Sequence, residues 1–157
     1  MKFELRFATS DDAETIHRFI SELAEYERDP KAVEVTPEIL RRQMMSKRPP
    51  FECLVVEEIG ASPIGFALFF HNYSTWKGQS GLYIEDIFVS PEYRGNGIGQ
   101  ALIRELASIA RDRNCGRMEW AVLDWNEPAI DFYKRHGAKP LEDWTIYRLT
   151  GKALEGL

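Results

Sequence analysis

Basic residues are in the minority in this chain. Its 20 lysines and arginines are outnumbered by 25 aspartates and glutamates, which gives a formal net charge of −5 at pH 7. Proteins that bind the nucleic-acid backbone neutralise its phosphates with clustered cationic side chains. The acidic balance therefore argues against a nucleic-acid partner and fits a cationic small molecule better.

Cysteines and long apolar runs are also scarce. Cys53 and Cys115 lack the close spacing of a metal or redox pair, so we expect structural thiols in a reducing cytosol. His17 and His71 have no acidic or cysteine partners at ligand spacing, and no metal site is predicted. Charge alternates with apolarity over residues 2–6, unlike a signal peptide, and no run is long enough to span a bilayer. We expect a cytoplasmic protein that does not bind membranes.

What the chain does have is the composition of a folded globular protein. Hydrophobic residues make up 44% and aromatic residues 12% of its 157 positions, which is enough for one sizeable core. No internal repeat or low-complexity linker interrupts the chain. We therefore expect one domain over residues 1–157.

Apolar periodicity and turn signals alternate along the sequence. Strands are predicted over residues 2–7, 51–59, 64–70, 82–89, 119–123 and 144–149. Helices are predicted to begin near residues 10, 36, 97 and 126, and to end near residues 28–30, 46, 114–116 and 137. This order, with a hairpin in the middle, predicts an α/β sheet of mixed direction with helices on both faces.

One glycine-rich segment lies between a predicted strand and a predicted helix. It reads Arg94-Gly95-Asn96-Gly97-Ile98-Gly99, so several amides without bulky side chains can turn toward one point at a helix N-terminus. Such a point suits a pyrophosphate. Alternate glycines also occur in ordinary tight turns and in dinucleotide-binding loops, but a dinucleotide fold places them after its first strand, and here they lie past mid-chain.

The flanking residues bring a family resemblance. Ile84-Glu85-Asp86-Ile87-Phe88-Val89, followed by the Arg-x-x-Gly-x-Gly pattern at residues 94–99, resembles the acetyl-CoA motif of the GCN5-related N-acetyltransferase (GNAT) superfamily. The resemblance implies acetyl-CoA as co-substrate and a mixed, mostly antiparallel central sheet with a splayed parallel strand pair. By matching position, the residues that contact CoA are Ile87, Phe88, Val89, Arg94, Gly95, Asn96, Gly97, Ile98, Gly99 and Gln100, together with Asn126, Glu127, Pro128 and Ala129.

Further segments resemble the diamine and thialysine acetyltransferase branch. Residues 74–78 and 122–126 look more like its thialysine members, whereas Glu127-Pro128 and residues 132–135 look more like its diamine members. This resemblance implies acetyl transfer to a primary amine of a small polyamine, diamine or lysine analogue. It also implies a homodimer, and the apolar stretch around Trp144, Ile146 and Tyr147 is expected to help cover the partner.

The resemblance assigns two catalytic roles. Tyr133 matches the tyrosine that protonates the departing CoA thiolate, a suitable donor because phenol and thiol pKa values differ by only about 1.5 units. Glu85 matches a strand glutamate that accepts the amine proton through water. As alternatives, Tyr133 packs beside Phe132, and Glu85 or Asp86 forms a salt bridge with a helix.

Acceptor contacts are expected from Tyr26, Glu27, Glu85, Asp86, Glu119 and Trp120. A solvated helix end is the alternative for Glu27, and a solvent-facing strand is the alternative for Glu119 and Trp120. Asn126 is also a good ordinary helix cap. His136 replaces an arginine that helps hold the CoA phosphates in diamine members.

Two other functions share the same CoA platform. One is acetylation of an amino acid or a protein N-terminus, which needs a differently shaped acceptor groove. The other is a CoA-binding regulatory module without transfer activity, against which the presence of both Glu85 and Tyr133 speaks.

Overall fold

A five-stranded sheet organises the first of two compact units in this chain. The computed structural model describes residues 1–157, which divide into Met1–Ala121 and Val122–Leu157. The strands are β1 (Phe3–Phe7), β2 (Glu52–Glu58), β3 (Pro63–Ser74), β4 (Gln79–Val89) and β5 (Met118–Trp120). The helices of this unit are α1 (Ala13–Tyr26), α2 (Pro37–Met44) and α3 (Ile98–Asp112), with short 3-10 turns at Ser10–Asp12, Pro30–Ala32 and Pro91–Tyr93.

The strands follow one another across the sheet in the order β1-β2-β3-β4-β5. The first four pair antiparallel: α1 and α2 lie between β1 and β2, and short turns join β2 to β3 and β3 to β4. In contrast, β4 and β5 are parallel and are joined through α3. The parallel contact covers only Leu82 to Ile84 on β4, so β4 runs on toward Val89 paired with β3 but not with β5. The predicted mixed sheet with a splayed parallel pair is confirmed.

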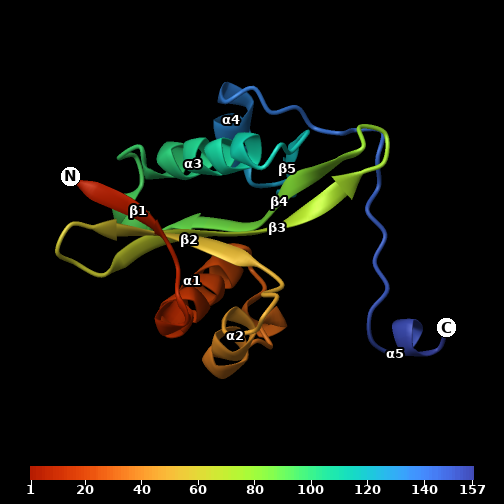
Figure 1. Ribbon diagram of the computed structural model, residues 1–157, viewed down its shortest axis with the longest axis horizontal. Helices are drawn as coiled ribbons and strands as arrows, with labels where there is room; N and C mark the ends of the chain where they lie inside the picture. The colour runs from red at the N-terminus through yellow and green to blue at the C-terminus, as the bar shows by residue number, and fades with distance from the viewer. The chain divides into compact units, whose positions relative to one another are not determined.

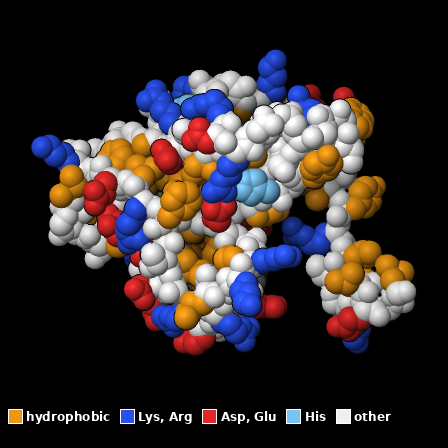
Figure 2. Space-filling view, viewed as in Figure 1, with side chains coloured by type: hydrophobic (Ala, Val, Ile, Leu, Met, Phe, Trp, Pro, Cys, Tyr) orange, Lys and Arg blue, Asp and Glu red, His pale blue; other side chains and the backbone are white.

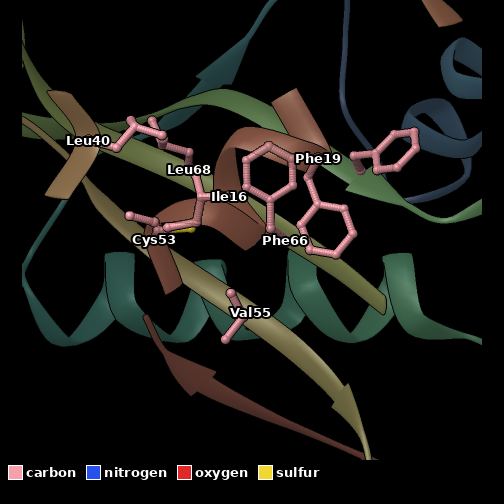
Figure 3. Packing of buried hydrophobic residues seen from close by; sticks show 9 residues of the cluster. Ile16, Phe19, Leu40, Cys53, Val55, Phe66 and Leu68 are labelled. Carbon is pink, nitrogen blue, oxygen red and sulfur yellow. The ribbon is translucent and has the colours of Figure 1, made fainter. Parts of the chain in front are cut away.

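Helices cover both faces of this sheet, with α3 on one side and α1 and α2 on the other (Figure 1). Ile16 and Phe19 of α1 are fully buried because they share one helix face, and Leu102 and Leu106 do the same on α3. Phe19 of α1 stacks on Phe66 of β3, with ring centroids 5.4 Å apart (Figure 3). The three- and four-residue spacing of these apolar side chains therefore places them on the buried helix faces.

Strand lengths differ from the prediction at the far hairpin. β3 and β4 continue past their apolar halves through Asn72, Tyr73 and Ser80, which pair in register. Each strand satisfies the other's backbone groups there, so the ladder extends without an apolar face. In contrast, β5 ends at Trp120, three residues before the predicted end, because only its first residues meet β4.

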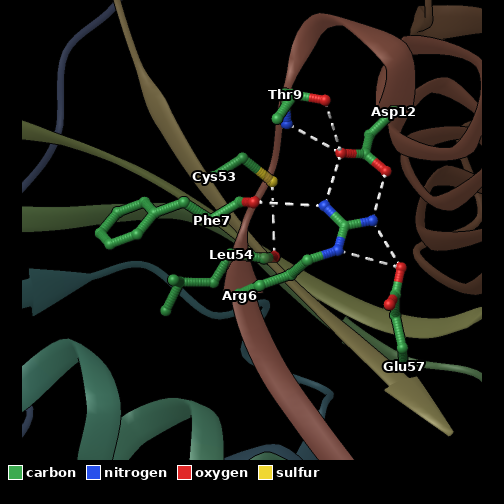
Figure 4. A network of polar contacts seen from close by, with 7 residues as sticks. All are labelled: Arg6, Phe7, Thr9, Asp12, Cys53, Leu54 and Glu57. Carbon is green, nitrogen blue, oxygen red and sulfur yellow. Dashed lines mark hydrogen bonds and ion pairs between the residues drawn. The ribbon is translucent and has the colours of Figure 1, made fainter. Parts of the chain in front are cut away.

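A polar network joins β1, the turn before α1, and β2. Arg6 donates to both carboxylate oxygens of Asp12 at 2.8 Å and also to Glu57, while the backbone amide of Thr9 donates to Asp12 (Figure 4). The Arg6 hydrogen bonds lower the pKa of Asp12, and the Asp12 carboxylate in turn raises the pKa of Arg6. This fork fixes the start of α1 relative to the sheet edge.

The second unit, Val122–Leu157, contains α4 (Glu127–Arg135) and α5 (Gly151–Glu155). The predicted strand over residues 144–149 is wrong: no strand forms, and all six residues are exposed. Their apolar, β-branched composition favours a strand, but a strand also needs a neighbour to pair with, and none pairs here. The short α5 was not predicted. In neither unit is a helix both long and apolar enough to cross a membrane.

Candidate active site

The loop between β4 and α3 has the backbone shape expected of an anion site. Gly95 and Gly97 adopt left-handed φ values of 78° and 81°, which other residues rarely reach. Gly97 is the N-cap of α3 and supplies no side-chain cap, so the first amides of this 15-residue helix lack a side-chain acceptor. These amides and the positive end of the helix dipole are suited to hold a pyrophosphate.

Two side chains brace this loop. Asn96 donates its Nδ2 to the carbonyl oxygens of Tyr93 and Arg94, at 3.0 and 3.3 Å. Arg94 donates its Nε to the carbonyl oxygen of Val89 at 2.8 Å. The loop is therefore preformed by its own contacts, which lowers the entropy cost of ordering it around a ligand.

An open strand edge leads into the loop. The last β4–β5 pair joins Ile84 to Trp120, while β4 continues along β3 to Val89. Backbone groups of Ile87 to Val89 on the edge facing β5 therefore have no β5 partner. Amides and carbonyls there are suited to hydrogen-bond an extended amide-bearing arm such as pantetheine, as an added strand does.

A β-bulge places the two carboxylates of β4. Leu68 of β3 pairs with Asp86, and the next residue, Phe69, pairs with Ile84, so Glu85 is the extra residue. Glu85 is exposed, and Asp86 is half-buried. Neither carboxylate takes part in any of the salt bridges of this unit, so the helix salt bridge considered from sequence is not formed.

Asp86 lies among other acidic groups. Burial is the main factor that raises its pKa to about 6, and the charges of Glu85 and Glu27 add to the effect. Desolvation also raises the pKa of Glu27, although that residue as a whole is exposed. The structure therefore brings together three predicted acceptor contacts that lie up to 59 positions apart in the sequence.

The end of α1 holds Tyr26 and Glu27 in a defined geometry. Arg28 follows at a φ of 68°, its amide donates to Glu25, and the amide of Asp29 donates to Ala24 at 2.9 Å. This is a Schellman ending with a non-glycine residue in the left-handed position. Tyr26 is half-buried, and the guanidinium of Arg94 lies 5.0 Å from its ring centroid.

Glu119 and Trp120 end β5 and are both half-buried. The Glu119 carboxylate lies 3.2 Å from Arg117 Nε and accepts a 3.5 Å hydrogen bond from Asn72. These contacts tie Glu119 to Arg117 and to Asn72 of β3, and Glu119 is half-buried rather than on a solvent-facing strand.

The second unit carries the remaining predicted site residues on and before α4. Asn126 is buried at the N-cap, Glu127 and Pro128 begin the helix, and Ala129 lies in its first turn. Tyr133 is half-buried one helical turn later, and its ring lies 5.5 Å from that of Phe132.

His136 ends α4 with contacts of its own. Its Nδ1 lies 2.8 Å from the carbonyl oxygen of Phe132, and its ring centroid lies 4.4 Å from that of Phe132. Because a carbonyl only accepts, Nδ1 carries the proton in this bond. A histidine here thus secures the helix end, whatever else it contacts.

Sequence reasoning missed two features of the site. The bulge at Glu85 has no sequence signal, because it arises from a register shift against β3. The packing of the Arg94 side chain against Tyr26 and Phe88 was also not predicted. Its one signal in the sequence is an arginine that precedes two loop glycines, with aromatic residues on the elements that flank the loop.

The chain resembles known acetyltransferases in both sequence and fold. The acetyltransferase (GNAT) family model matches residues 15–138. Thialysine N-epsilon-acetyltransferase of Bos taurus is 41% identical, covering 98% of this chain and 95% of the bovine protein. Spermidine/spermine N(1)-acetyltransferase-like protein 1 of Homo sapiens is 34% identical over 97% of this chain, but only 23% of the human protein is covered.

Among solved structures, an integron cassette protein from the mobile metagenome of V. cholerae has a TM-score of 0.82 and 28% sequence identity, covering 99% of this chain and 97% of that one. The phosphate loop, the open β4 edge and these matches agree with one another. The chain therefore belongs to the acetyltransferase (GNAT) family, in its diamine and thialysine branch, and is an N-acetyltransferase that uses acetyl-CoA.

Proposed function

We propose that this enzyme acetylates the primary amine of a small acceptor that carries a second cationic nitrogen, such as a polyamine, a diamine or thialysine. The observation that carries this proposal is the cluster of Glu27, Glu85 and Asp86 beside the open end of β4. A carboxylate cluster without cationic partners favours a ligand with more than one positive charge. The names of the bovine and human relatives support the same acceptor class.

Removal of a proton from the acceptor is the first chemical requirement. An alkylamine has a pKa of about 10, so it is mostly protonated at neutral pH and has no lone pair for attack. We assign Glu85 as proton acceptor through water. Asp86 is its neighbour in the cluster, and with a pKa of about 6 it is mostly ionised at neutral pH.

The transfer itself needs no covalent enzyme intermediate. The neutral amine attacks the thioester carbonyl within a ternary complex, a C–N bond forms, and the C–S bond breaks. Backbone amides at the end of β4 stabilise the oxyanion. The first proton has left the ammonium for Glu85 through water before the attack, and the second leaves the nitrogen for bulk water as the C–S bond breaks. Tyr133 gives its phenolic proton to the leaving CoA sulfur and is reprotonated from solvent.

Binding roles follow from the same assignment. The loop from Arg94 to Gln100 takes the pyrophosphate, Ile87 to Val89 take the pantetheine arm, and the segment from Asn126 to Ala129 adds a second contact with CoA. Tyr26, Glu27, Glu119 and Trp120 line the acceptor side. The family match across residues 15–138 supports one acetyltransferase domain made of both units.

We also infer a homodimer in the cytoplasm. Trp144, Ile146 and Tyr147 are largely exposed, with Tyr147 93% exposed, and hydrophobic side chains face solvent along the end of the chain (Figure 2). A second copy that pairs with residues 144–149 would supply the missing strand neighbour. Both cysteines are free, which is consistent with a reducing compartment.

The experiment that tests the proposal is release of CoA thiol from acetyl-CoA by purified protein at mildly alkaline pH. The acceptor panel contains spermidine, short diamines, thialysine, lysine and a short peptide with a free N-terminus. We expect turnover with one of the dicationic small amines. Turnover with the peptide alone would contradict the proposed acceptor class, and CoA binding without turnover would favour a regulatory module.

A further inference from the structure

The side chain of Arg94 reaches from the phosphate loop to the acceptor end of α1. Its guanidinium carbon lies 5.0 Å from the ring centroid of Tyr26 and 5.4 Å from that of Phe88. Its Nε–H donates to the carbonyl oxygen of Val89 at 2.8 Å. A single side chain therefore contacts the last turn of α1 and the last two residues of β4.

These contacts join two sites that are separate in the sequence. The backbone of Arg94 begins the loop with the two left-handed glycines, where the pyrophosphate is expected. Tyr26 and Glu27 lie at the end of α1, where the acceptor is expected. Phe88 is buried and lies 6.1 Å from Phe19, so the contact is anchored in the core and not only on the surface.

We infer that Arg94 is a positioning residue that couples acetyl-CoA binding in the loop to the acceptor-binding end of α1 through its contact with Tyr26. This inference rests on the proposed function for the identity of the acceptor end. The sequence comparison gave Arg94 only a CoA contact. In the structure, its Nε donates to the Val89 carbonyl oxygen and its guanidinium lies over the rings of Tyr26 and Phe88, so the side chain contacts α1 while the backbone begins the loop.

Two consequences follow from this coupling. Binding of CoA fixes the loop, and through Arg94 it stabilises the last turn of α1, where Arg28 already occupies a left-handed conformation. Because coupling between two bound ligands is reciprocal, the acceptor also raises the affinity for CoA by the same factor.

Hydrogen exchange tests the coupling without any acceptor. Amides of residues 23–29 are compared with and without free CoA in wild type, Arg94→Ala and Arg104→Ala, the last being an exposed arginine on α3 and a matched loss of charge. We expect CoA to slow exchange at least about threefold in wild type and Arg104→Ala, and to leave Arg94→Ala unchanged at saturating CoA. Equal protection of residues 23–29 in Arg94→Ala would overturn the inference.

A double-mutant cycle then measures the effect on the acceptor. We expect Arg94→Ala and Tyr26→Leu each to raise the KM for spermidine or thialysine by about fivefold or more. The KM of the double variant should be no higher than that of the more impaired single variant, because both changes break the same contact. Arg94→Lys should recover part of the loss. If the two single effects on the acceptor KM multiply in the double variant, or if Arg94→Ala raises only the KM for acetyl-CoA, the inference is also overturned. Absence of wild-type turnover with every amine contradicts the proposed acceptor instead, and the hydrogen-exchange result still decides the role of Arg94.

Discussion

The two units of this protein differ sharply in how they are held together. Met1–Ala121 contains all of the buried hydrophobic residues, whereas Asn126 is the one buried residue of Val122–Leu157. The first unit carries the sheet, the phosphate loop and the carboxylate cluster, and the second carries Tyr133. The difference teaches that the glycine-rich loop and the carboxylates rest on a packed core, whereas the proposed proton donor lies in a segment with almost no core of its own.

The largest expected effect comes from the second unit. Tyr133→Phe removes one hydroxyl and should lower kcat at least about 100-fold, because the thiolate would leave unprotonated. The KM for acetyl-CoA should stay nearly unchanged. Steady-state kinetics with the preferred amine check this, with Lys134→Ala on the exposed face of α4 as control. A Tyr133→Phe enzyme with wild-type turnover would remove Tyr133 from the mechanism.

The next effect comes from the carboxylate cluster of the first unit. Asp86→Asn should lower kcat/KM for the amine by about 10- to 100-fold. In wild type, kcat/KM should fall as the pH drops through about 6, because Asp86 then gains a proton. Glu85→Gln, which removes the proposed proton acceptor, should lower kcat/KM at least as far, and wild-type kcat/KM in Asp86→Asn would remove Asp86 from the cluster's role.

The same substitution should stabilise the protein while it impairs the enzyme. The pKa of Asp86 is raised by folding, so the folded state binds its proton more tightly and the charged form above about pH 6 is destabilising. Asp86→Asn should therefore raise the free energy of unfolding at pH 8 by on the order of 2 kcal/mol. Urea denaturation at pH 8 and pH 4 measures this, and the gain should shrink at pH 4. A loss of stability at pH 8 would contradict the assignment.

Breaking the Arg6–Asp12 fork should weaken the packed unit. Asp12→Ala leaves Arg6 with Glu57 as its one carboxylate partner and removes the acceptor of the Thr9 amide, which should cost about 2 kcal/mol of unfolding free energy. Because Arg6 lowers the pKa of Asp12, this contribution is present above the unfolded pKa of about 3.9 and is lost as the pH falls through the folded value. Urea titrations from pH 7 to pH 2 check this. Glu14→Ala, in a fully exposed ion pair, is the control.

The smallest effect on folding should follow changes at the end of the chain. Ile146→Asp should shift the oligomer toward monomer, because it places a charge in the proposed contact with a second copy. The urea midpoint of the first unit should not move, since Ile146 is 77% exposed. Light scattering after size exclusion measures the mass. A wild-type monomer at micromolar concentration would contradict the dimer.

Local signals in the sequence predicted the elements that bury their own apolar face. Two helices formed where expected, one around Ile16 and Phe19 and one around Leu102, and so did the turn that contains Gly95 and Gly97. Periodicity and turn chemistry act over a few residues, so they can be read from the sequence. Residues 144–149 carry an equally good strand pattern and form none. A pattern predicts a strand only when a neighbouring strand is available.

The sequence by itself determined the family, the co-substrate and the glycine-rich turn before α3, because these depend on contiguous residues whose backbone conformation is set locally. Tertiary structure alone decided that Glu85 stands in a bulge, that burial among carboxylates raises the pKa of Asp86, and that Arg94 packs on Tyr26. Each of these requires segments distant in the sequence to meet. Register, desolvation and charge proximity are properties of that meeting and have no signature in any single stretch of the chain.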